Sequence, residues 1–269
     1  MKKIYVLVVL LAFAVAACKD DDNGIEGNDP AVVTEEFDEA FARELFNRGY
    51  ITDPEDIAKI KEEVAGITEL DVSDVQNNGG LTSLKGIEYF SSLEVLDCSD
   101  NNLTTLDVSG CTALTELSCY NNSLTTLDVS HNTALRKLWC YNNNLTTLDV
   151  SGCTALTELY CGGNNLSTLD VSANTALDYL FCYNNSLTTL DVSHNTALRK
   201  LWCYNNNLTT LDVSNNTALK HMLCFYNPGS GGVFTVVSWF DDTTVPSENF
   251  TTGNWYYKDN HVTIHYQKK

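Results

Sequence analysis

The stretch LTTLDVSHNTALRKLWCYNNNLTTLDVS, residues 124–151, decides the fold of this protein, and the same letters return unchanged at residues 187–214. Both copies are built on a repeat of 21 residues with the pattern L-x-x-L-x-C-x-x-N-x-L-T-T-L-D-V-S-x-N-T-A. A fixed period of this length is typical of a solenoid, in which each repeat is one rung and buries its apolar side chains against neighbouring rungs.

Seven rungs follow one another in unbroken register, and a longer, degenerate rung precedes them from Ile67. The leucines that open the seven rungs are Leu93, Leu114, Leu135, Leu156, Leu177, Leu198 and Leu219. In L-x-x-L-x-C the fourth and sixth residues are expected to point into the core and the third, fifth and seventh outward, because side chains alternate along a strand. The returning L-T-T-L-D-V-S contains poor helix formers, so we expect it to be extended or 3₁₀-helical.

The short period, the L-D-V core and a helical segment before the array resemble the leucine-rich repeat family, and within it the bacterial internalin-like proteins. The resemblance implies a leucine-rich repeat solenoid, a horseshoe with a parallel β-sheet on its concave face. A small helical N-terminal cap and a β-rich C-terminal cap are expected from the segments that flank the repeats. The family binds many unrelated ligands, so the fold by itself does not give the function.

Residues 1–17 are expected to be a lipoprotein signal peptide, since Lys2 and Lys3 precede a short apolar run and small residues precede Cys18. This resembles a bacterial lipoprotein signal, which implies lipidation of Cys18 and a membrane anchor. An ordinary secretory signal with a chance cysteine is the alternative. The acidic run at 19–22 resembles the export tag of Bacteroidetes lipoproteins, which implies the outer membrane and the cell surface, and residues 18–33 are expected to be an acidic tether.

The rest of the chain divides into a helical N-terminal cap at 34–66, the repeats at 67–227 and a β-rich C-terminal cap at 228–269. Thr34 is predicted to cap the first helix, and Asp53 followed by Pro54 the second. In the C-terminal segment we expect a strand at 233–239 and a hairpin formed by 255–258 and 261–266, which would cover the open edge of the last rung.

Asparagine, cysteine and aspartate each recur at one position of the repeat and so form a column along the solenoid. Each column has a structural interpretation. The asparagines are expected to satisfy backbone groups where the strands turn, because an unpaired buried group costs about 1–3 kcal/mol. The column consists of Asn101, Asn122, Asn143, Asn164, Asn185, Asn206 and Asn227.

The sixth-position cysteines are expected to be buried free thiols, because parallel side chains do not offer the torsion that a disulfide needs. A zinc site is the less favoured alternative, since a straight column cannot surround one ion. These cysteines are Cys98, Cys119, Cys140, Cys161, Cys182, Cys203 and Cys224, while Cys111 and Cys153 are expected to be turn residues.

The aspartates of L-D-V are expected to accept hydrogen bonds from the N–H groups of their own turns. Calcium binding between stacked carboxylates is the less favoured alternative. This column consists of Asp107, Asp128, Asp149, Asp170, Asp191 and Asp212.

The outward face of the strands is rich in aromatic residues, and contiguous exposed aromatics usually mark a binding surface. The predicted ligand-binding residues are Trp139, Tyr141, Tyr160, Tyr179, Phe181, Tyr183, Trp202, Tyr204, Lys137, Lys200 and Glu158. Gly162 interrupts the tyrosine column and is expected to leave a notch for a side chain or a sugar ring. The alternative is that the rings stack along the ladder and stiffen the sheet.

The formal charge of −19 disfavours nucleic acid as a partner. No nucleophile elbow, zinc-protease motif or phosphate-binding loop occurs, so we expect neither an enzyme nor a cofactor or metal requirement. The leading hypothesis is a surface lipoprotein that binds a protein ligand through its concave aromatic face, as in adhesion, by analogy with the internalins. The alternatives are glycan binding and a structural envelope protein without a soluble ligand.

Overall fold

The computed structural model describes residues 36–74, 80–246, 249–252, 254–257 and 260–269, which all belong to one unit, Val33–Lys269. The predicted signal peptide, the lipidation site Cys18 and the acidic tether lie outside the described residues. Their roles stay predictions.

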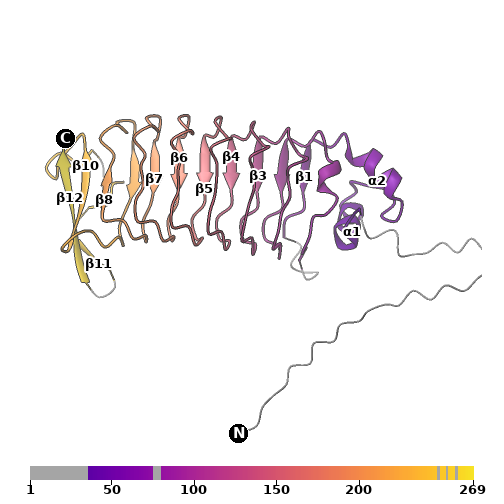
Figure 1. The fold of residues 1–269 in the computed structure, drawn as a ribbon, viewed down its shortest axis with the longest axis horizontal. Coiled ribbons are helices and arrows are strands. Elements are labelled where there is room, and N and C mark those ends of the chain that lie inside the picture. Colours follow the sequence, from indigo (N-terminus) through magenta and orange to yellow (C-terminus); the bar gives the residue numbers. More distant parts are fainter. Residues whose placement is uncertain (1–35, 75–79, 247–248, 253, 258–259) are drawn as a thin grey trace, which may run out of the picture. The chain divides into compact units, whose positions relative to one another are not determined.

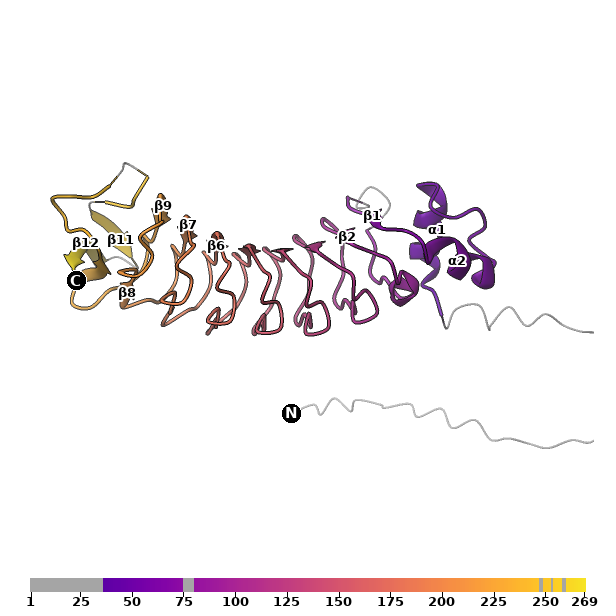
Figure 2. The same ribbon diagram turned by 90° about the horizontal axis from the view of Figure 1, so that it is seen from above.

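Each rung contributes one three-residue strand to a parallel sheet of eight strands (Figure 1). Its strands, in spatial order, are β1 (Glu69–Asp71), β2 (Val95–Asp97), β3 (Glu116–Ser118), β4 (Lys137–Trp139), β5 (Glu158–Tyr160), β6 (Tyr179–Phe181), β7 (Lys200–Trp202) and β9 (His221–Leu223). Equivalent residues of successive rungs pair directly, as Leu117 does with Leu138. Figure 2 shows the strands along the inner edge of the arc and the connecting segments along its outer edge.

The core follows the repeat. The fourth-position leucine and the sixth-position cysteine are buried in every one of the seven regular rungs, except that Met222 replaces the leucine in the last. On the convex side the chain is extended between turns, with isolated bridges that join Asp107 to Asp128 and Asp128 to Asp149. The predicted fold class is confirmed.

The asparagine column holds neighbouring rungs together. The side-chain oxygen of Asn143 accepts a hydrogen bond from the backbone N–H of Leu124 at 2.9 Å, and its amide nitrogen donates to the carbonyls of Cys119 at 3.0 Å and Cys140 at 3.2 Å. The other six asparagines of the column bond in the same way. The predicted role of these residues is therefore confirmed.

Two short helices close the N-terminal end, and both begin later than the sequence predicted. Helix α1 (Glu39–Asn47) is capped by Asp38 and not by Thr34, which lies outside the described residues. Helix α2 (Ile57–Val64) is capped by Asp56, whereas Asp53 accepts a hydrogen bond from a backbone N–H in the turn before the helix. The capping predictions were wrong because several acidic residues close together can each serve as a cap.

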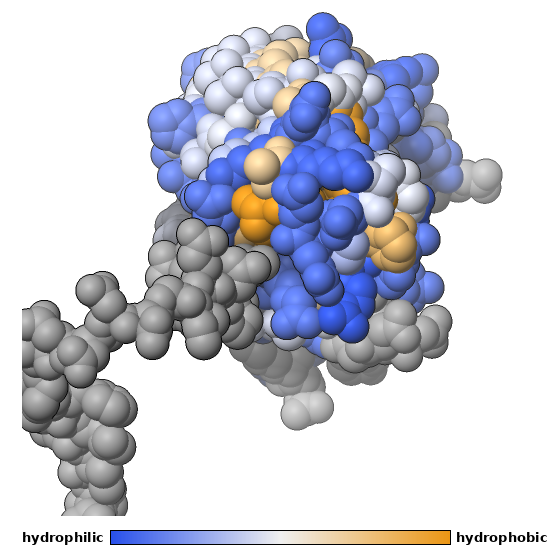
Figure 3. Space-filling view, turned by 90° about the vertical axis from the view of Figure 1, so that its right-hand side faces the viewer, coloured by the Kyte–Doolittle hydropathy of each residue, from blue (hydrophilic) through white to orange (hydrophobic). Residues whose placement is uncertain are grey.

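The end of the molecule formed by these helices is largely hydrophilic where it meets solvent (Figure 3). Most of its apolar residues point the other way, so that Phe41, Leu45 and Ile60 are buried, whereas Phe46 is exposed. The 3₁₀ segment η2 (Ile87–Tyr89) lies in the degenerate rung. Within the described residues, no helix has the length and apolar character that crossing a bilayer requires.

The C-terminal segment forms a second sheet, in the order β11-β12-β10-β8. Its strands are β8 (Thr210–Asp212), β10 (Val233–Ser238), β11 (Asn254–Tyr257) and β12 (Asn260–Lys268). Strand β10 pairs with β8, which is the return segment of the sixth rung, while β11 and β12 pair as an antiparallel hairpin. The edge of β9 is covered by residues 249–251, which exchange backbone hydrogen bonds with Met222.

Candidate functional site: the concave aromatic face

The predicted site residues all lie on the outward side of the parallel sheet. At the fifth position Trp139, Tyr160, Phe181 and Trp202 end β4 to β7 and pair in register, which places their rings in one continuous row, the fifth-position row. The seventh-position row follows just beyond the strands. It consists of Tyr120, Tyr141, Tyr183, Tyr204 and Phe225.

The rings of the fifth-position row stack on one another. The centroids of Tyr160 and Phe181 lie 4.4 Å apart with planes at 23°, and those of Phe181 and Trp202 lie 4.1 Å apart at 10°. Trp139 is the exception, because it lies 6.0 Å from Tyr160 at 33°. In this row the faces of most rings are covered by neighbouring rings, and the edges face the concave side.

The seventh-position row is stacked even more regularly. Tyr120 and Tyr141 lie 4.4 Å apart at 5°, and Tyr204 lies 4.9 Å from Tyr183 at 6° and 4.6 Å from Phe225 at 9°. Such offset pairs contribute about 0.5–1.5 kcal/mol each beyond the area that they bury. The rings therefore stack along the ladder, as the alternative interpretation of the sequence expected.

The expected notch at Gly162 does not exist. A Cβ atom at this glycine would meet the ring of Tyr183 at 2.6 Å, so the tyrosine lies directly against the glycine backbone. The glycine leaves room for the tyrosine of the next rung and not for a ligand. The prediction was wrong because the width of the gap depends on the side-chain conformation of Tyr183.

The residues of the face differ in how much they can contact a ligand. Phe181 is only 9% exposed, whereas the other ten predicted residues are partly exposed. Burial, together with neighbouring tyrosines, raises the pKa of Tyr141 to about 12. Burial also raises the pKa of Tyr183 and Tyr204, so these hydroxyls stay protonated at neutral pH and can donate and accept hydrogen bonds.

Charged side chains border the fifth-position row. Lys137 forms an ion pair with Glu116 at 2.8 Å, and its Nζ lies 5.9 Å from the ring of Trp139. Lys200, its equivalent in the second copy, lies 4.6 Å above the ring of Tyr179. Burial, and after it the carboxylate of Glu158, raises the pKa of Tyr160 above its usual range.

Sequence reasoning missed a column of amides beside the tyrosines. Its members adopt positive φ angles and turn the chain away from the strands: Asn121, Asn142, Asn184 and Asn205. Asn142 donates to the side-chain oxygen of Asn121 at 2.7 Å, and Asn205 to that of Asn184 at 2.9 Å. The signal was the Asn-Asn pair that ends most strand segments, whose first asparagine tolerates the left-handed conformation.

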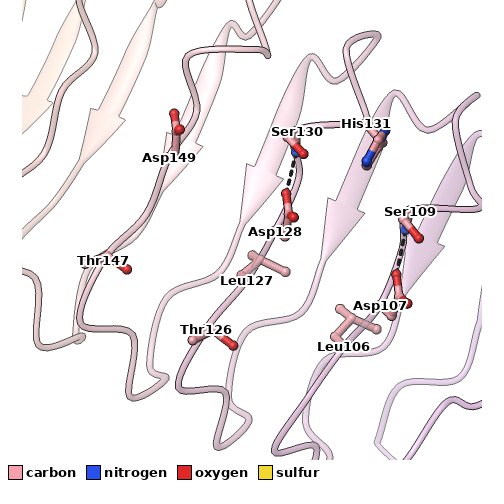
Figure 4. Close-up of a pocket in the computed structure, with 10 residues that line it drawn as sticks. All are labelled: Leu106, Asp107, Ser109, Thr126, Leu127, Asp128, Ser130, His131, Thr147 and Asp149. Carbon is pink, nitrogen blue, oxygen red and sulfur yellow. Dashed lines mark hydrogen bonds between the residues drawn. The ribbon is translucent and has the colours of Figure 1, made fainter.

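The aspartate column lies on the convex side, and Figure 4 shows Asp107, Asp128 and Asp149 on the return segments of successive rungs. Asp107 accepts from the N–H of Ser109 at 3.0 Å, and Asp128 from that of Ser130 at 2.9 Å. The side chains of Ser109 and Ser130, and after them these backbone hydrogen bonds, lower the pKa of the two carboxyls. The other four aspartates of the column accept the same bond from the serine two residues later, which confirms the predicted structural role.

All nine cysteines in the described part of the chain are buried free thiols, which confirms the prediction for the sixth-position column. Cys111 and Cys153 are equally buried in the convex turns, where the Sγ of Cys111 lies 3.3 Å from the carbonyl of Ile87. Burial raises the pKa of Cys111 to about 12 and of Cys153 to about 11. In the same described residues, no group of three His, Cys, Asp or Glu side chains is arranged to hold a metal ion.

Comparisons with known proteins agree with this geometry. A model of two leucine-rich repeats matches residues 91–132 and 133–174, and a model of one leucine-rich repeat matches 183–198 and 204–219. The functional domain of InlJ from Listeria monocytogenes, which includes a cysteine ladder, is 45% identical over 61% of this chain, with a TM-score of 0.58. This chain contains leucine-rich repeats and folds as a leucine-rich repeat solenoid similar to those of the internalins.

Two further solved structures are similar to this chain. A leucine-rich repeat protein of Leptospira interrogans is 27% identical over 64% of this chain, with a TM-score of 0.59. Internalin C2 of Listeria monocytogenes is 20% identical over 86% of this chain and 96% of its own, with a TM-score of 0.61, a likeness of fold alone. The chain spans 36% of the InlJ structure and 46% of the Leptospira structure. No curated protein matches the sequence.

Proposed function

We propose that this protein binds a protein ligand through the concave aromatic face while a lipid on Cys18 anchors it in the outer membrane, with the solenoid at the cell surface. The internalin-like fold is commonly used for protein–protein interaction, and proteins that carry it are typically binding scaffolds. The solenoid supplies the rigid frame, and the two aromatic rows supply the contact surface.

One observation carries the choice of a protein ligand. The rings in both rows are stacked on one another, so the concave side presents ring edges, tyrosine hydroxyls and charged side chains and few open ring faces. Sugar rings bind aromatic platforms through the ring face, whereas protein side chains pack against edges and bond to hydroxyls. The stacked rings are also already ordered, which lowers the entropic cost of binding.

Glycan binding remains a second candidate at one place. Trp139 is tilted by 33° from Tyr160 and lies 6.0 Å from it, so that this indole is the least closely stacked ring of the fifth-position row. A sugar could stack there. A glycan ligand should then depend on Trp139 far more than on Trp202, which lies closely against Phe181.

The test is binding of the full chain to arrays of extracellular proteins and of glycans. The informative variant is Tyr141→Phe with Tyr204→Phe, because it removes two hydroxyls and keeps the stacking. We expect about tenfold weaker binding to a protein ligand, as each lost hydrogen bond contributes roughly 0.5–1.5 kcal/mol.

The matched control is Thr125→Ala with Thr188→Ala, an exposed pair at equivalent convex positions of the two copies. It should bind as the unaltered protein does. Absence of any protein ligand, or equal losses in both double variants, would leave the aromatic rows as architecture and favour the structural role.

The anchor is tested separately. Metabolic labelling with palmitate should mark the unaltered chain and not Cys18→Ser, and protease added to intact cells should remove the labelled protein. A chain released into the medium without label would support the ordinary secretory signal instead.

A further inference from the structure

Lysine occurs at the same place in both copies of the duplicated stretch, but its surroundings differ. Lys137 lies between Glu116 of β3 and Glu158 of β5, and it forms an ion pair with the first at 2.8 Å. Lys200 lies between Tyr179 of β6 and His221 of β9. Throughout the described residues no carboxylate lies within ion-pair distance of Lys200, whose Nζ rests over the ring of Tyr179 at 4.6 Å.

The charge of the concave sheet also differs between its two ends, from acidic at the N-terminal strands to cationic at the C-terminal strands. The strand segments 67–73, 93–99 and 114–120 contain five carboxylates and neither Lys nor Arg. The segments 198–204 and 219–225 contain Arg199, Lys200 and Lys220, together with His221, and no carboxylate. In a chain of net charge −19 this cationic end of the concave face is an exception to the overall composition.

The side chains around Lys200 hold it in place. The guanidinium of Arg199 is bonded to the carboxylate of Asp178, with Nε at 2.6 Å, and it lies 5.6 Å from the ring of Tyr179. Tyr179 is therefore fixed between two cations, and only one of these cations has a carboxylate partner. A lysine whose Nζ lies over a tyrosine ring of a binding face, and which has no carboxylate partner among the described residues, is suited to a carboxylate of the ligand.

We infer that the C-terminal end of the concave face, at Lys200 and His221, takes an acidic peptide segment of the protein ligand. This inference rests on the proposed function and names the chemistry of the partner. The ring edges of Tyr179 and Trp202 contact the apolar side chains between the acidic residues. The first copy does not bind such a segment, because Glu116 and Glu158 neutralise Lys137 and repel other carboxylates.

The experiment measures binding of a fluorescent oligoglutamate peptide to the full chain by anisotropy, with oligolysine and oligogalacturonate as comparison probes. Lys200→Met should weaken oligoglutamate binding about fivefold, since a solvent-accessible charge pair contributes up to about 1 kcal/mol. Lys137→Met, the matched change in the identical stretch, should stay within about twofold of the unaltered chain. Raising the salt concentration should weaken binding, because the contact is made at the surface.

Lys200→Met could lose binding because the substitution disturbs the fold, so a variant that is expected to gain binding is a second test. Glu116→Gln with Glu158→Gln uncovers Lys137 and should strengthen oligoglutamate binding about fivefold. An equal loss in both lysine variants, or binding of oligogalacturonate alone, would overturn the inference.

The two proposals fail separately. A protein ligand found on the array could need the tyrosine hydroxyls and bind Lys200→Met as well as the unaltered chain. That result would support the proposed function and contradict the inference of an acidic segment. Oligoglutamate binding that requires Lys200, in a protein with no array ligand, would keep the charge preference and remove the proposed function.

Discussion

Residues 124–151 and 187–214 have identical sequences and the same backbone course, yet they offer different surfaces. The lysine of the first copy is paired with a glutamate, whereas that of the second lies on a tyrosine ring. Trp202 stacks on Phe181 at 4.1 Å, while Trp139 is tilted away from Tyr160 and its indole N–H is buried without a hydrogen-bond partner among the described residues.

The convex sides of the copies differ as well. In the second copy the segment Thr210–Asp212 becomes strand β8 and pairs with β10, whereas in the first copy Asp149 makes only an isolated bridge to Asp128. On the concave face the difference comes from the adjacent rungs, and on the convex side it comes from strand β10 of the C-terminal segment. The comparison teaches that in this solenoid the unit of surface chemistry is a pair of neighbouring rungs and not a single repeat.

The largest expected effect should not distinguish the copies, since it acts on the thiol column that runs through both. The folded-state pKa of these thiols is raised by burial above the ordinary value of 9.0, to about 12 for Cys161 and Cys224. Below pH 9 the folded and unfolded chains bind the same protons, so stability is fully present. Above it the unfolded chain loses protons first, and each buried thiol lowers the free energy of unfolding by about 1.4 kcal/mol per pH unit.

Urea unfolding followed by circular dichroism should therefore give a constant midpoint up to about pH 9 and a steep fall between pH 9 and 12. Cys140→Ala and Cys203→Ala should each reduce the slope by the same amount. A midpoint that does not move in alkaline solution would contradict the buried thiols.

The next effect is also expected to be equal in the two copies. Asn143→Ala and Asn206→Ala each leave a leucine N–H and the carbonyls of two cysteines without their side-chain partner. We expect a loss of about 3 kcal/mol in the free energy of unfolding for either variant, because unpaired buried groups cost about 1–3 kcal/mol each. Unequal losses, measured by urea unfolding, would show that the rungs are not equivalent in their backbone contacts.

The tryptophans should separate the copies. Trp202→Leu removes a close stacking partner of Phe181, whereas Trp139→Leu removes a tilted contact and relieves a buried N–H that has no partner. We expect Trp202→Leu to be the more destabilising by about 1.5 kcal/mol. Thermal unfolding of the two variants side by side measures the difference, and equal losses would mean that the ring environments are the same.

The smallest expected effect is on the free energy of unfolding of the two lysine variants, and it is detected by measuring that free energy at several salt concentrations. Lys137→Met should cost about 0.5 kcal/mol at low ionic strength, and less as salt screens the pair with Glu116. Lys200→Met removes a contact with the ring of Tyr179, so its effect on stability should not depend on salt in this way. Identical salt dependence of the two variants would refute the difference between the copies.

The sequence predicted the features that depend on the period alone. The buried leucines, the buried thiols, the asparagine column and the aspartate turns recur every 21 residues, and each is determined by contacts that every rung repeats. The helix starts were misplaced, because Asp38 and Asp56 compete with other residues that can cap a helix. Those choices depend on how the chain enters the cap and not on a repeat.

The concave face was only half predictable for the same reason. Its residues follow from strand alternation, and their place on one surface was predicted correctly. The fate of Gly162 and the surroundings of Lys200 depend on side chains one rung away, Tyr183 and Tyr179, whose conformations no pattern within a single repeat contains. Whether the predicted residues bind a ligand stays a prediction.

The equal register of all rungs also bears on how such a chain can change its length. Leu124 and Leu187 begin the two identical copies three whole rungs apart, so a recombination between the copies deletes or adds three rungs without disturbing the reading frame or the hydrogen-bonding pattern. The shortened or lengthened solenoid would keep both caps. Recombination would change how many rungs the concave face has and leave the packing of each rung as it is.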